Sequence, residues 1–440
     1  DQKRYVPGSV EMILDGLRWL GLNWDEGPEV GGDYGPYVQS ERTALYQQWA
    51  NWLVEQGRAY CCYCTPKQLK ERRAQGMTGY DRHCRTLTPD QRAAHQARGD
   101  AFVIRFKMPL EGETTVHDLI RGDITVHNEN LTDLILLKSD GYPTYHLANV
   151  VDDHFMAISH ILRADEWISS APVHARLYQA FGWEMPAIAH LPVILNPNGQ
   201  GKLSKRAVGF THDGRRVPVL VHEFREAGYL PEAVVNFLTN IGWSFGDDRE
   251  VFTVEETIAR FDLARVNPAG GKFPLEKLDW LNGVYIRESK PEALVGPLAE
   301  VLEARGYAVD RDVLLRAIPL IQPRIQSLLE VVEWVGFLFK NGVRPTAEQL
   351  IQEKMDAEST RAALTAAYDT LAALPDFEVP TLEKALRALT GDLGLKTHQL
   401  FGTLRIAVTG QPVAPPLFET MAILGREACL KRIGEAQAVL

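Results

Sequence analysis

A basic, glycine-rich stretch, GQGKLSKRAV at residues 199–208, places Lys202 and Lys205 on either side of Ser204. Ammonium groups on a loop of this kind can fold over a nucleotide and neutralise the charge that develops on its phosphates during a displacement. Taken alone, Lys-x-Ser-Lys also fits a solvated surface turn. However, the loop directly follows AIAHLPVIL at residues 187–195, which is typical of a buried strand. In an α/β domain, a nucleotide binds at such a position.

The strand before this loop is the second half of a strand–helix–strand pattern. Residues 156–162, MAISHIL, are typical of a short buried strand, and an amphipathic helix follows around Leu177. Such a crossover predicts a doubly wound α/β domain that binds ligands at the carboxyl ends of its strands. Arg163 and the basic loop stand at two such ends. Arg163 is therefore a candidate ligand-binding cation, with ion pairs to Asp165 or Asp152 as the structural alternative.

The remaining elements indicate two further parts. Residues 59–144 contain strand-like segments and a tight-turn signal at Asp140-Gly141, which predicts an inserted α+β domain. The strand-like segments are residues 101–108, 123–128 and 131–139. From about residue 310 the sequence has the spacing of helices. The predicted fold class is α/β: a doubly wound, Rossmann-like domain with an inserted α+β domain, followed by all-α carboxyl-terminal domains.

The bulk composition excludes several classes of protein. With 45% apolar and 24% charged residues among 440, the chain has too many apolar residues for a disordered protein. No stretch is apolar enough to span a bilayer, and the first residues lack the apolar centre of a signal peptide. Five cysteines cannot all pair, which favours a reducing, cytoplasmic setting.

One region is basic although the net charge is −10. Two lysines and four arginines fall between Lys67 and Arg85. A cluster like this is usually a solvated helix face, and the alternative is a contact with nucleic-acid phosphates.

KLSKR at residues 202–206 resembles the Lys-Met-Ser-Lys-Ser signature of class I aminoacyl-tRNA synthetases, in the form used by glutamyl-tRNA synthetases. The resemblance covers essentially the whole chain, through residues 134–167, 190–206, 229–244, 276–287 and 394–433. It implies a monomeric, cytoplasmic ligase. Such an enzyme converts L-glutamate and ATP, with Mg²⁺, to glutamyl-adenylate and transfers the glutamyl group to the 3′ end of tRNA(Glu). Whether tRNA(Gln) is also a substrate stays open.

The resemblance assigns roles to individual residues. Arg163 matches the arginine that binds the glutamate side chain, since a guanidinium offers a carboxylate a planar, bidentate partner. The neighbouring substrate contacts are Tyr145 and Asn149. The expected ATP-binding residues are Lys205, Ser204, Glu166, Trp167, Val193 and Ile194, and the expected catalytic residues are Lys202 and Lys205. The family pattern Arg-Gly-x-Glu-Trp has Ala164 in place of glycine here. Because alanine disfavours a positive φ, a slightly different local backbone is expected.

Three cysteines match the first zinc ligands of many bacterial members, namely Cys62, Cys64 and Cys84. Those members bind zinc through Cys-x-Cys and Cys-x-His, whereas Thr86 stands at the last position here and is a poor zinc ligand. His83 or Cys61 could substitute, but adjacent residues rarely reach the same metal. The sequence therefore favours a metal-free cluster over a zinc site and leaves the fourth ligand unidentified.

The inserted segment resembles the acceptor-stem-binding domain of the family, so Arg72, Arg73 and Arg82 are expected to contact tRNA phosphates. Arg324, placed at a helix start, is the candidate for reading the anticodon. The expected domains are 1–58 and 145–206 for the two parts of the catalytic domain, 59–144 for the inserted domain, 207–290 for a stem-contact domain, and 291–378 and 379–440 for two helical anticodon-binding domains.

The His-Ile-Gly-His signature, which supplies the other half of a class I active site, is not found in this sequence. The opening residues, DQKRYVPGS, resemble what lies downstream of it in the family, so an upstream segment is expected to carry it and the chain alone is expected to be inactive. One alternative is a catalytically silent tRNA-binding paralogue. Another is a glutamyl-queuosine synthetase, which would lack the helical carboxyl-terminal domains.

Overall fold

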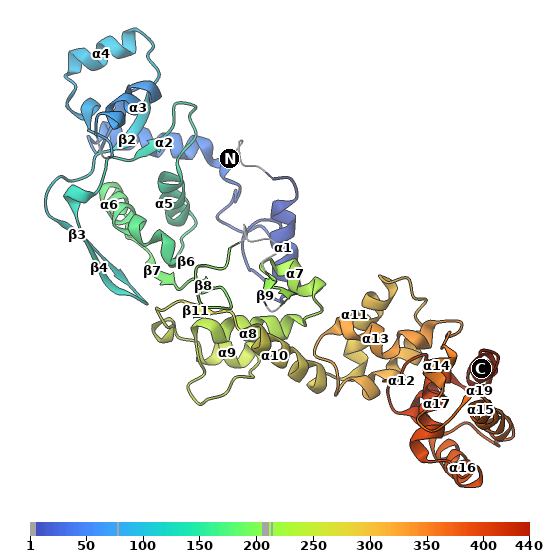
Figure 1. The fold of residues 1–440 in the computed structure, drawn as a ribbon. Coiled ribbons are helices and arrows are strands. Elements are labelled where there is room, and N and C mark those ends of the chain that lie inside the picture. The colour runs from blue at the N-terminus through green and yellow to red at the C-terminus, as the bar shows by residue number, and fades with distance from the viewer. Residues whose placement is uncertain (1–5, 77–78, 205–210, 213) are drawn as a thin grey trace. The chain divides into compact units, whose positions relative to one another are not determined.

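The computed structural model describes residues 6–76, 79–204, 211–212 and 214–440 (Figure 1). The chain divides into two compact units, one formed by residues 1–203 with 238–273 and the other by residues 204–237 with 274–440. The first unit holds the sheets of the predicted α/β and inserted domains, and the second is almost entirely helical. Among the described residues, no helix is long and apolar enough to cross a membrane.

A four-stranded mixed sheet carries the candidate site. Its strand order is β4-β3-β7-β6, with β7 parallel to both neighbours and β4 antiparallel to β3. The strands are β3 (Glu113–Asp118), β4 (Gly122–His127), β6 (His160–Ala164) and β7 (Ala187–Leu191). Helix α6 (Ala171–Phe181) connects β6 to β7 and packs against β3, which confirms the predicted crossover. The strand expected at residues 156–162 begins later, because helix α5 (Tyr145–Phe155) runs on to Phe155.

Strand β3 is not predicted by the sequence pattern. Its sequence, ETTVHD, buries Thr114, Val116 and Asp118 on one face, so a single apolar residue carries the burial signal. Asp118, the last residue of the strand, pairs in register with Ile188 of β7. Strands β3 and β4 fall within residues 59–144 and yet belong to the same sheet as β6 and β7.

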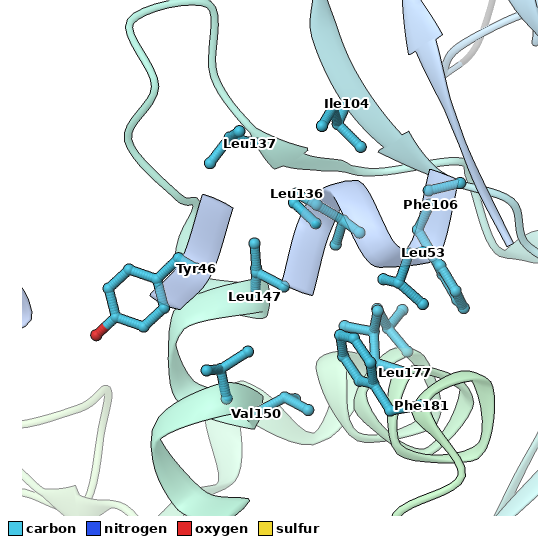
Figure 2. Packing of buried hydrophobic residues seen from close by; sticks show 14 of the residues in the cluster. Tyr46, Leu53, Ile104, Phe106, Leu136, Leu137, Leu147, Val150, Leu177 and Phe181 are labelled. Carbon is cyan, nitrogen blue, oxygen red and sulfur yellow. The ribbon is translucent and has the colours of Figure 1, made fainter. Parts of the chain in front are cut away.

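A second, antiparallel sheet has the order β1-β2-β5, with strands β1 (Ala59–Cys62), β2 (Val103–Phe106) and β5 (Ile135–Leu137). One hydrophobic core joins this sheet to α2 (Thr43–Glu55), α5 and α6 (Figure 2). Leu53, Leu136, Leu147 and Leu177 meet in it with no exposed surface. Removing such a side chain costs about 2–5 kcal/mol, so this core holds the candidate site and the inserted strands together. The turn predicted at Asp140-Gly141 is confirmed, with Gly141 at φ 81°.

The basic loop follows a short strand, β8 (Ile194–Leu195), which pairs in parallel with β11 (Gly271–Lys272). Residues of helices α8 (Pro231–Gly242) and α9 (Val254–Arg260) line a cavity beside this strand. Ile194 lines an apolar cavity of about 260 Å³ together with Leu191 and Trp243.

The carboxyl-terminal unit contains two helical cores, and the division between them falls before residue 350 rather than at the expected boundary between residues 378 and 379. The first involves α10 (Leu275–Glu288), α11 (Pro291–Glu303), α12 (Arg311–Ile321) and α13 (Val331–Val335). The second involves α15 (Ala357–Ala372), α16 (Val379–Asp392), α17 (Thr397–Thr409), α18 (Leu417–Leu424) and α19 (Arg426–Gln437).

Candidate functional site

Arg163 lies near the carboxyl end of β6, where its guanidinium makes three hydrogen bonds. Its Nε donates to Nε2 of His190 at 3.0 Å, and its Nη1 donates to Nδ1 of His174 at 3.1 Å. Its Nη2 donates to the backbone oxygen of Trp167 at 3.2 Å. A guanidinium carries five N–H groups, so two remain, one on each Nη nitrogen. This pair matches the two oxygens of a carboxylate.

The carboxylates that could have neutralised Arg163 are taken by other arginines. Asp152 accepts from Nε of Arg42 at 2.7 Å, and Asp165 accepts from Nη2 of Arg121 at 3.1 Å. Among the described residues Arg163 forms no ion pair. The structural alternative for Arg163 is therefore wrong, and a half-buried cation without a carboxylate partner points to an anionic ligand.

The two histidines beside Arg163 are held as hydrogen-bond acceptors. An arginine can only donate, so Nε2 of His190 and Nδ1 of His174 must each present a lone pair. The proton of His190 then lies on Nδ1, which faces Oδ2 of Asp118 at 2.5 Å. Burial, together with the charge of Arg163, lowers the pKa of His174 to about 3. His174 is therefore neutral, and Arg163 is the cation of this site.

Tyr145 and Asn149 lie one turn apart on α5 and face the same site. The Tyr145 ring centre is 4.5 Å from that of Trp167, and Tyr145 is 43% exposed. The Nδ2 of Asn149 lies 3.5 Å from Nδ1 of His174, whereas its buried Oδ1 has no hydrogen-bond partner among the described residues. A buried carbonyl oxygen without a partner calls for a donor, and the ammonium group of an amino acid is one.

The basic loop begins as an ordered turn. The backbone N–H of Asn196 bonds to Gly201, and that of Leu203 bonds to Ile194 at 2.8 Å. This brings Lys202 beside Leu195, and the Lys202 ammonium forms an ion pair with the Glu166 carboxylate. An expected catalytic residue, Lys202, therefore meets an expected ATP-binding residue, Glu166.

The other expected ATP-binding residues are placed as follows. Ser204 is half-buried and follows this turn directly, Val193 precedes β8, and Lys205 lies outside the described residues. The Trp167 ring contacts the Tyr145 ring, and Ile194 lines the apolar cavity together with Trp243.

Ala164 does not strain the backbone. Its φ is −68° and its ψ 150°, which is extended and open to any residue. Because alanine adopts this conformation without strain, replacing glycine at position 164 does not require the different local backbone that was expected.

The three cysteines come together around a fourth side chain. The sulfur atoms of Cys62, Cys64 and Cys84 lie within 4.8 Å of one another. The Oη of Tyr80, a residue not expected at this site from the sequence, lies 3.1 Å from Sγ of Cys62 and 3.8 Å from Sγ of Cys64. Tetrahedral zinc with Zn–S bonds of about 2.3 Å holds its sulfurs about 3.8 Å apart. The spacing of these donors fits a zinc ion.

Neither substitute considered for the fourth zinc ligand joins this cluster. His83 and Thr86 are exposed, and Thr86 bonds to the backbone oxygen of His83. Cys61 follows the buried Tyr60 in β1 and alternates in direction with Cys62, so it faces away from the other sulfurs.

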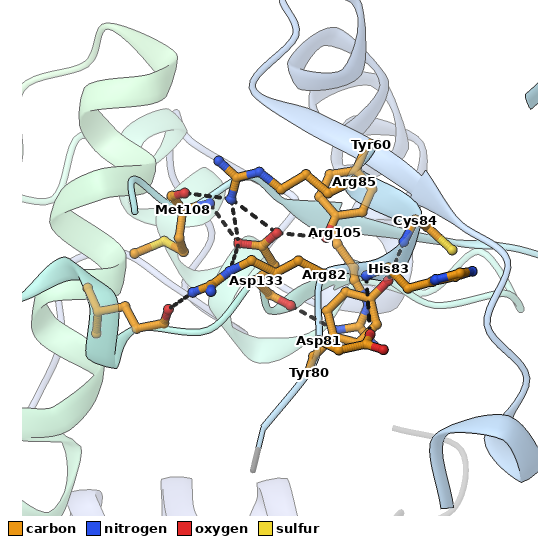
Figure 3. Close-up of polar contacts among 11 residues, drawn as sticks. Tyr60, Tyr80, Asp81, Arg82, His83, Cys84, Arg85, Arg105, Met108 and Asp133 are labelled. Carbon is orange, nitrogen blue, oxygen red and sulfur yellow. Dashed lines mark hydrogen bonds and ion pairs between the residues drawn. The ribbon is translucent and has the colours of Figure 1, made fainter. Parts of the chain in front are cut away.

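Much of the basic cluster is neutralised within the protein. Arg82 and Arg85 both form ion pairs with Asp133, whose carboxylate has no exposed surface and also accepts from Tyr60 at 2.7 Å (Figure 3). Arg72 bonds to Asp81 at 2.6 Å. Arg72 and Arg82 therefore have structural roles within the protein, and their expected contacts with tRNA phosphates stay predictions.

Arg73 differs from its neighbours, because it is exposed and has no hydrogen-bond or ion-pair partner among the described residues. It lines a cavity of about 490 Å³, and Tyr145, His146 and Trp167 line the same cavity. The cavity therefore connects Arg73 of the inserted segment with Tyr145 and Trp167, which lie beside Arg163.

Arg324 does not begin a helix. It lies three residues beyond the end of α12, exposed, with its guanidinium 5.5 Å from the centre of the Trp334 ring. The expected position at a helix start is therefore wrong, because Pro323 precedes it and α12 has already ended.

Residues 1–280 match the family described as class I tRNA synthetases for glutamate and glutamine (E and Q), catalytic domain, and residues 293–437 match an anticodon-binding domain. Fold and site thus define a class I aminoacyl-tRNA synthetase. The chain is 46% identical to a glutamate–tRNA ligase of Dehalococcoides mccartyi, over all of this chain and 90% of that protein. It is 45% identical to one of Roseiflexus sp., over all of this chain and 88% of that protein.

A crystal structure of a glutamate tRNA ligase from Elizabethkingia meningosepticum, in complex with its amino acid, is also similar. It has a TM-score of 0.85 at 32% identity, over all of this chain and 91% of that one. The chain belongs to the glutamate–tRNA ligase family. The named relatives give no support to a silent paralogue, and the anticodon-binding domain disfavours a glutamyl-queuosine synthetase.

Proposed function

We propose that this protein ligates L-glutamate to tRNA(Glu) in two steps, with Arg163 as the residue that selects glutamate. In the first step an α-carboxylate oxygen of glutamate attacks the α-phosphorus of ATP, and pyrophosphate leaves. In the second, a terminal ribose hydroxyl of the tRNA attacks the activated carbonyl carbon, and AMP leaves. No covalent enzyme intermediate is needed, so positioning and charge stabilisation supply the rate.

The observation that carries this proposal is the hydrogen bonding of Arg163. Three of its N–H groups are bound within the protein, and the remaining two are donors. A glutamate carboxylate accepts both, whereas the amide of glutamine would turn at least one N–H toward a donor. The unpartnered Oδ1 of Asn149 supports an ammonium group in the same pocket.

For ATP, we propose that Glu166 and Trp167 contact the nucleoside and that the lysines of the loop contact the phosphates. The ion pair between Lys202 and Glu166 links these two regions. Lys205 and Ser204 would bind the phosphates, and Mg²⁺ would accompany ATP as part of the substrate. Val193 and Ile194, at the start of β8, would also contact the nucleoside.

For tRNA, we propose that the acceptor end approaches along the cavity lined by Arg73, Tyr145 and Trp167. The helical domains would bind the anticodon region, where Arg324 remains a candidate because it is exposed and stacked on Trp334. The protein would act as a cytoplasmic monomer, and its five cysteines without disulfides support a reducing compartment.

We further propose that Cys62, Cys64, Cys84 and Tyr80 hold a zinc ion, in place of the metal-free cluster that the sequence favours. Zinc would act structurally, by tying β1 to the turn that contains Cys84. The support is the convergence of three sulfurs and one phenol oxygen at distances suited to one metal.

The proposal is tested by aminoacylation of purified tRNA(Glu) and tRNA(Gln) with the full-length enzyme. Arg163→Ala and Lys205→Ala are expected to reduce charging with glutamate strongly, and the pair of tRNAs shows whether tRNA(Gln) is also charged. Unchanged activity in both variants would overturn these site assignments.

A further inference from the structure

Three neighbouring strands, β3, β7 and β6, each carry one polar side chain at the proposed glutamate site, namely Asp118, His190 and Arg163. Arg163 of β6 pairs in register with His190 of β7, and Asp118 ends β3 on the other side of β7. The side chains of Asp118 and His190 have no exposed surface. Buried polar groups are costly unless they are hydrogen-bonded, so their bonds determine their states.

The Asp118 carboxylate is fully occupied as an acceptor. Oδ1 accepts the backbone N–H groups of Ile120 and Arg121 at 2.9 and 2.8 Å. Oδ2 accepts the backbone N–H of His190 at 3.0 Å and lies 2.5 Å from its Nδ1. Asp118 is thereby fixed by the turn after β3, and it keeps the His190 proton on Nδ1. The lone pair on Nε2 then faces Nε of Arg163.

We propose that His190 and Asp118 are positioning residues for Arg163. His190 fixes the rotation of the guanidinium by accepting from Nε, which leaves one N–H of each Nη nitrogen directed at the glutamate carboxylate. Asp118 acts through His190 by setting its tautomer. This inference rests on the proposed role of Arg163 in binding glutamate.

The competing explanation is that His190 only anchors β3 to β7 through Asp118. Two substitutions separate the roles, because each preserves one of the two bonds. In His190→Asn the amide nitrogen can take the place of Nδ1 and keep the bond to Asp118, but no acceptor reaches Arg163. In His190→Gln the amide oxygen can take the place of Nε2 and accept from Arg163, but the bond to Asp118 is lost.

The experiment measures glutamate activation by the full-length enzyme with tRNA present, at varied glutamate and varied ATP. His190→Asn is expected to raise the KM for glutamate at least about tenfold, as for loss of a hydrogen bond to a charged group, with kcat and the KM for ATP within about twofold. His190→Gln is expected to stay closer to the unsubstituted enzyme. Asp118→Asn is expected to behave like His190→Asn, because an amide can donate to Nδ1 and move the proton to Nε2.

His160→Asn and His160→Gln are matched controls, since His160 lies exposed at the start of the same strand as Arg163. They are expected to change neither KM. Nitrogen NMR of the histidines gives a second readout that needs no activity, and it is expected to show His190 as the neutral Nδ1–H tautomer. A His190→Gln enzyme equal to or worse than His190→Asn, or an Nε2–H tautomer, would overturn the inference. Failure of the unsubstituted enzyme to activate glutamate would instead overturn the proposed function.

Discussion

Arg82 lies with its Nε 3.5 Å from Oδ1 of Asp133, a carboxylate with no exposed surface, while Arg73 on the preceding helix has no partner among the described residues. The two arginines belong to one basic cluster in the sequence, yet their surroundings differ. Arg82 also donates to the backbone oxygen of Leu131 at 2.8 Å. Its charge is used largely within the protein, whereas that of Arg73 is available to a ligand.

Arg73→Gln is therefore expected to weaken tRNA binding without changing the unfolding temperature. If Arg73 contacts one phosphate, the slope of log K against log salt falls by about one. Arg82→Gln is expected to lower the free energy of unfolding by about 1–3 kcal/mol, because it leaves a buried charge with fewer partners. Filter binding over a salt series and thermal unfolding measure these effects. Equal losses of tRNA affinity at unchanged stability would contradict the distinction.

The cysteine cluster is expected to hold about one zinc per chain in the purified protein. Cys64→Ser is expected to abolish zinc binding, and Tyr80→Phe is expected to weaken it, because each removes one of four donors. Metal analysis and competition with a chelator measure both effects. Cys429→Ala is the control, since Cys429 is buried in the second helical core, which belongs to the other compact unit. A folded protein without zinc after growth in zinc-supplemented medium would contradict this prediction.

Asp153 is expected to make stability depend on pH. Burial, the largest cause, raises the pKa of Asp153 to about 6 from an ordinary value of 3.8, while a hydrogen bond from Tyr178 partly opposes this. The folded protein therefore holds the proton more tightly than the unfolded chain, and stability falls as the pH rises between those two values.

Asp153→Asn removes this penalty. It is expected to stabilise the protein by about 3 kcal/mol at pH 8 and to have little effect near pH 4, as measured by denaturant unfolding. Asp15→Asn, at an exposed position, is expected to change stability at neither pH. A constant effect of Asp153→Asn across this pH range would show that the carboxyl does not titrate differently in the folded state.

The sequence predicts those parts of the fold that have a strong apolar pattern. The β6–α6–β7 crossover, the turn at Gly141 and the helical carboxyl-terminal unit are all confirmed. Strand β3 is missed, because only Val116 marks its buried face, while Thr114 and Asp118 are polar and buried through tertiary contacts. No local pattern encodes such contacts.

The same limit applies to the site. The placement of Arg163, Tyr145 and Asn149 together is expected from the resemblance, and the structure brings them together with His174. His190 and Tyr80 are missed, since each acts through a partner far away in the sequence. For Tyr80 the sequence does contain one signal, namely its position four residues before Cys84. In the structure this spacing lets the Tyr80 hydroxyl accept the Cys84 N–H.

The most direct test of the account measures kcat/KM for glutamate and for glutamine in pyrophosphate exchange, with tRNA present, in the full-length enzyme and its Arg163→Lys variant. A lysine keeps the charge but loses the planar pair of donors. Activity with glutamate is expected to fall at least about a hundredfold, and the preference for glutamate over glutamine is expected to shrink, while the KM for ATP stays within about threefold. An Arg163→Lys enzyme that retains both its activity with glutamate and its preference would contradict the claim that Arg163 selects the substrate.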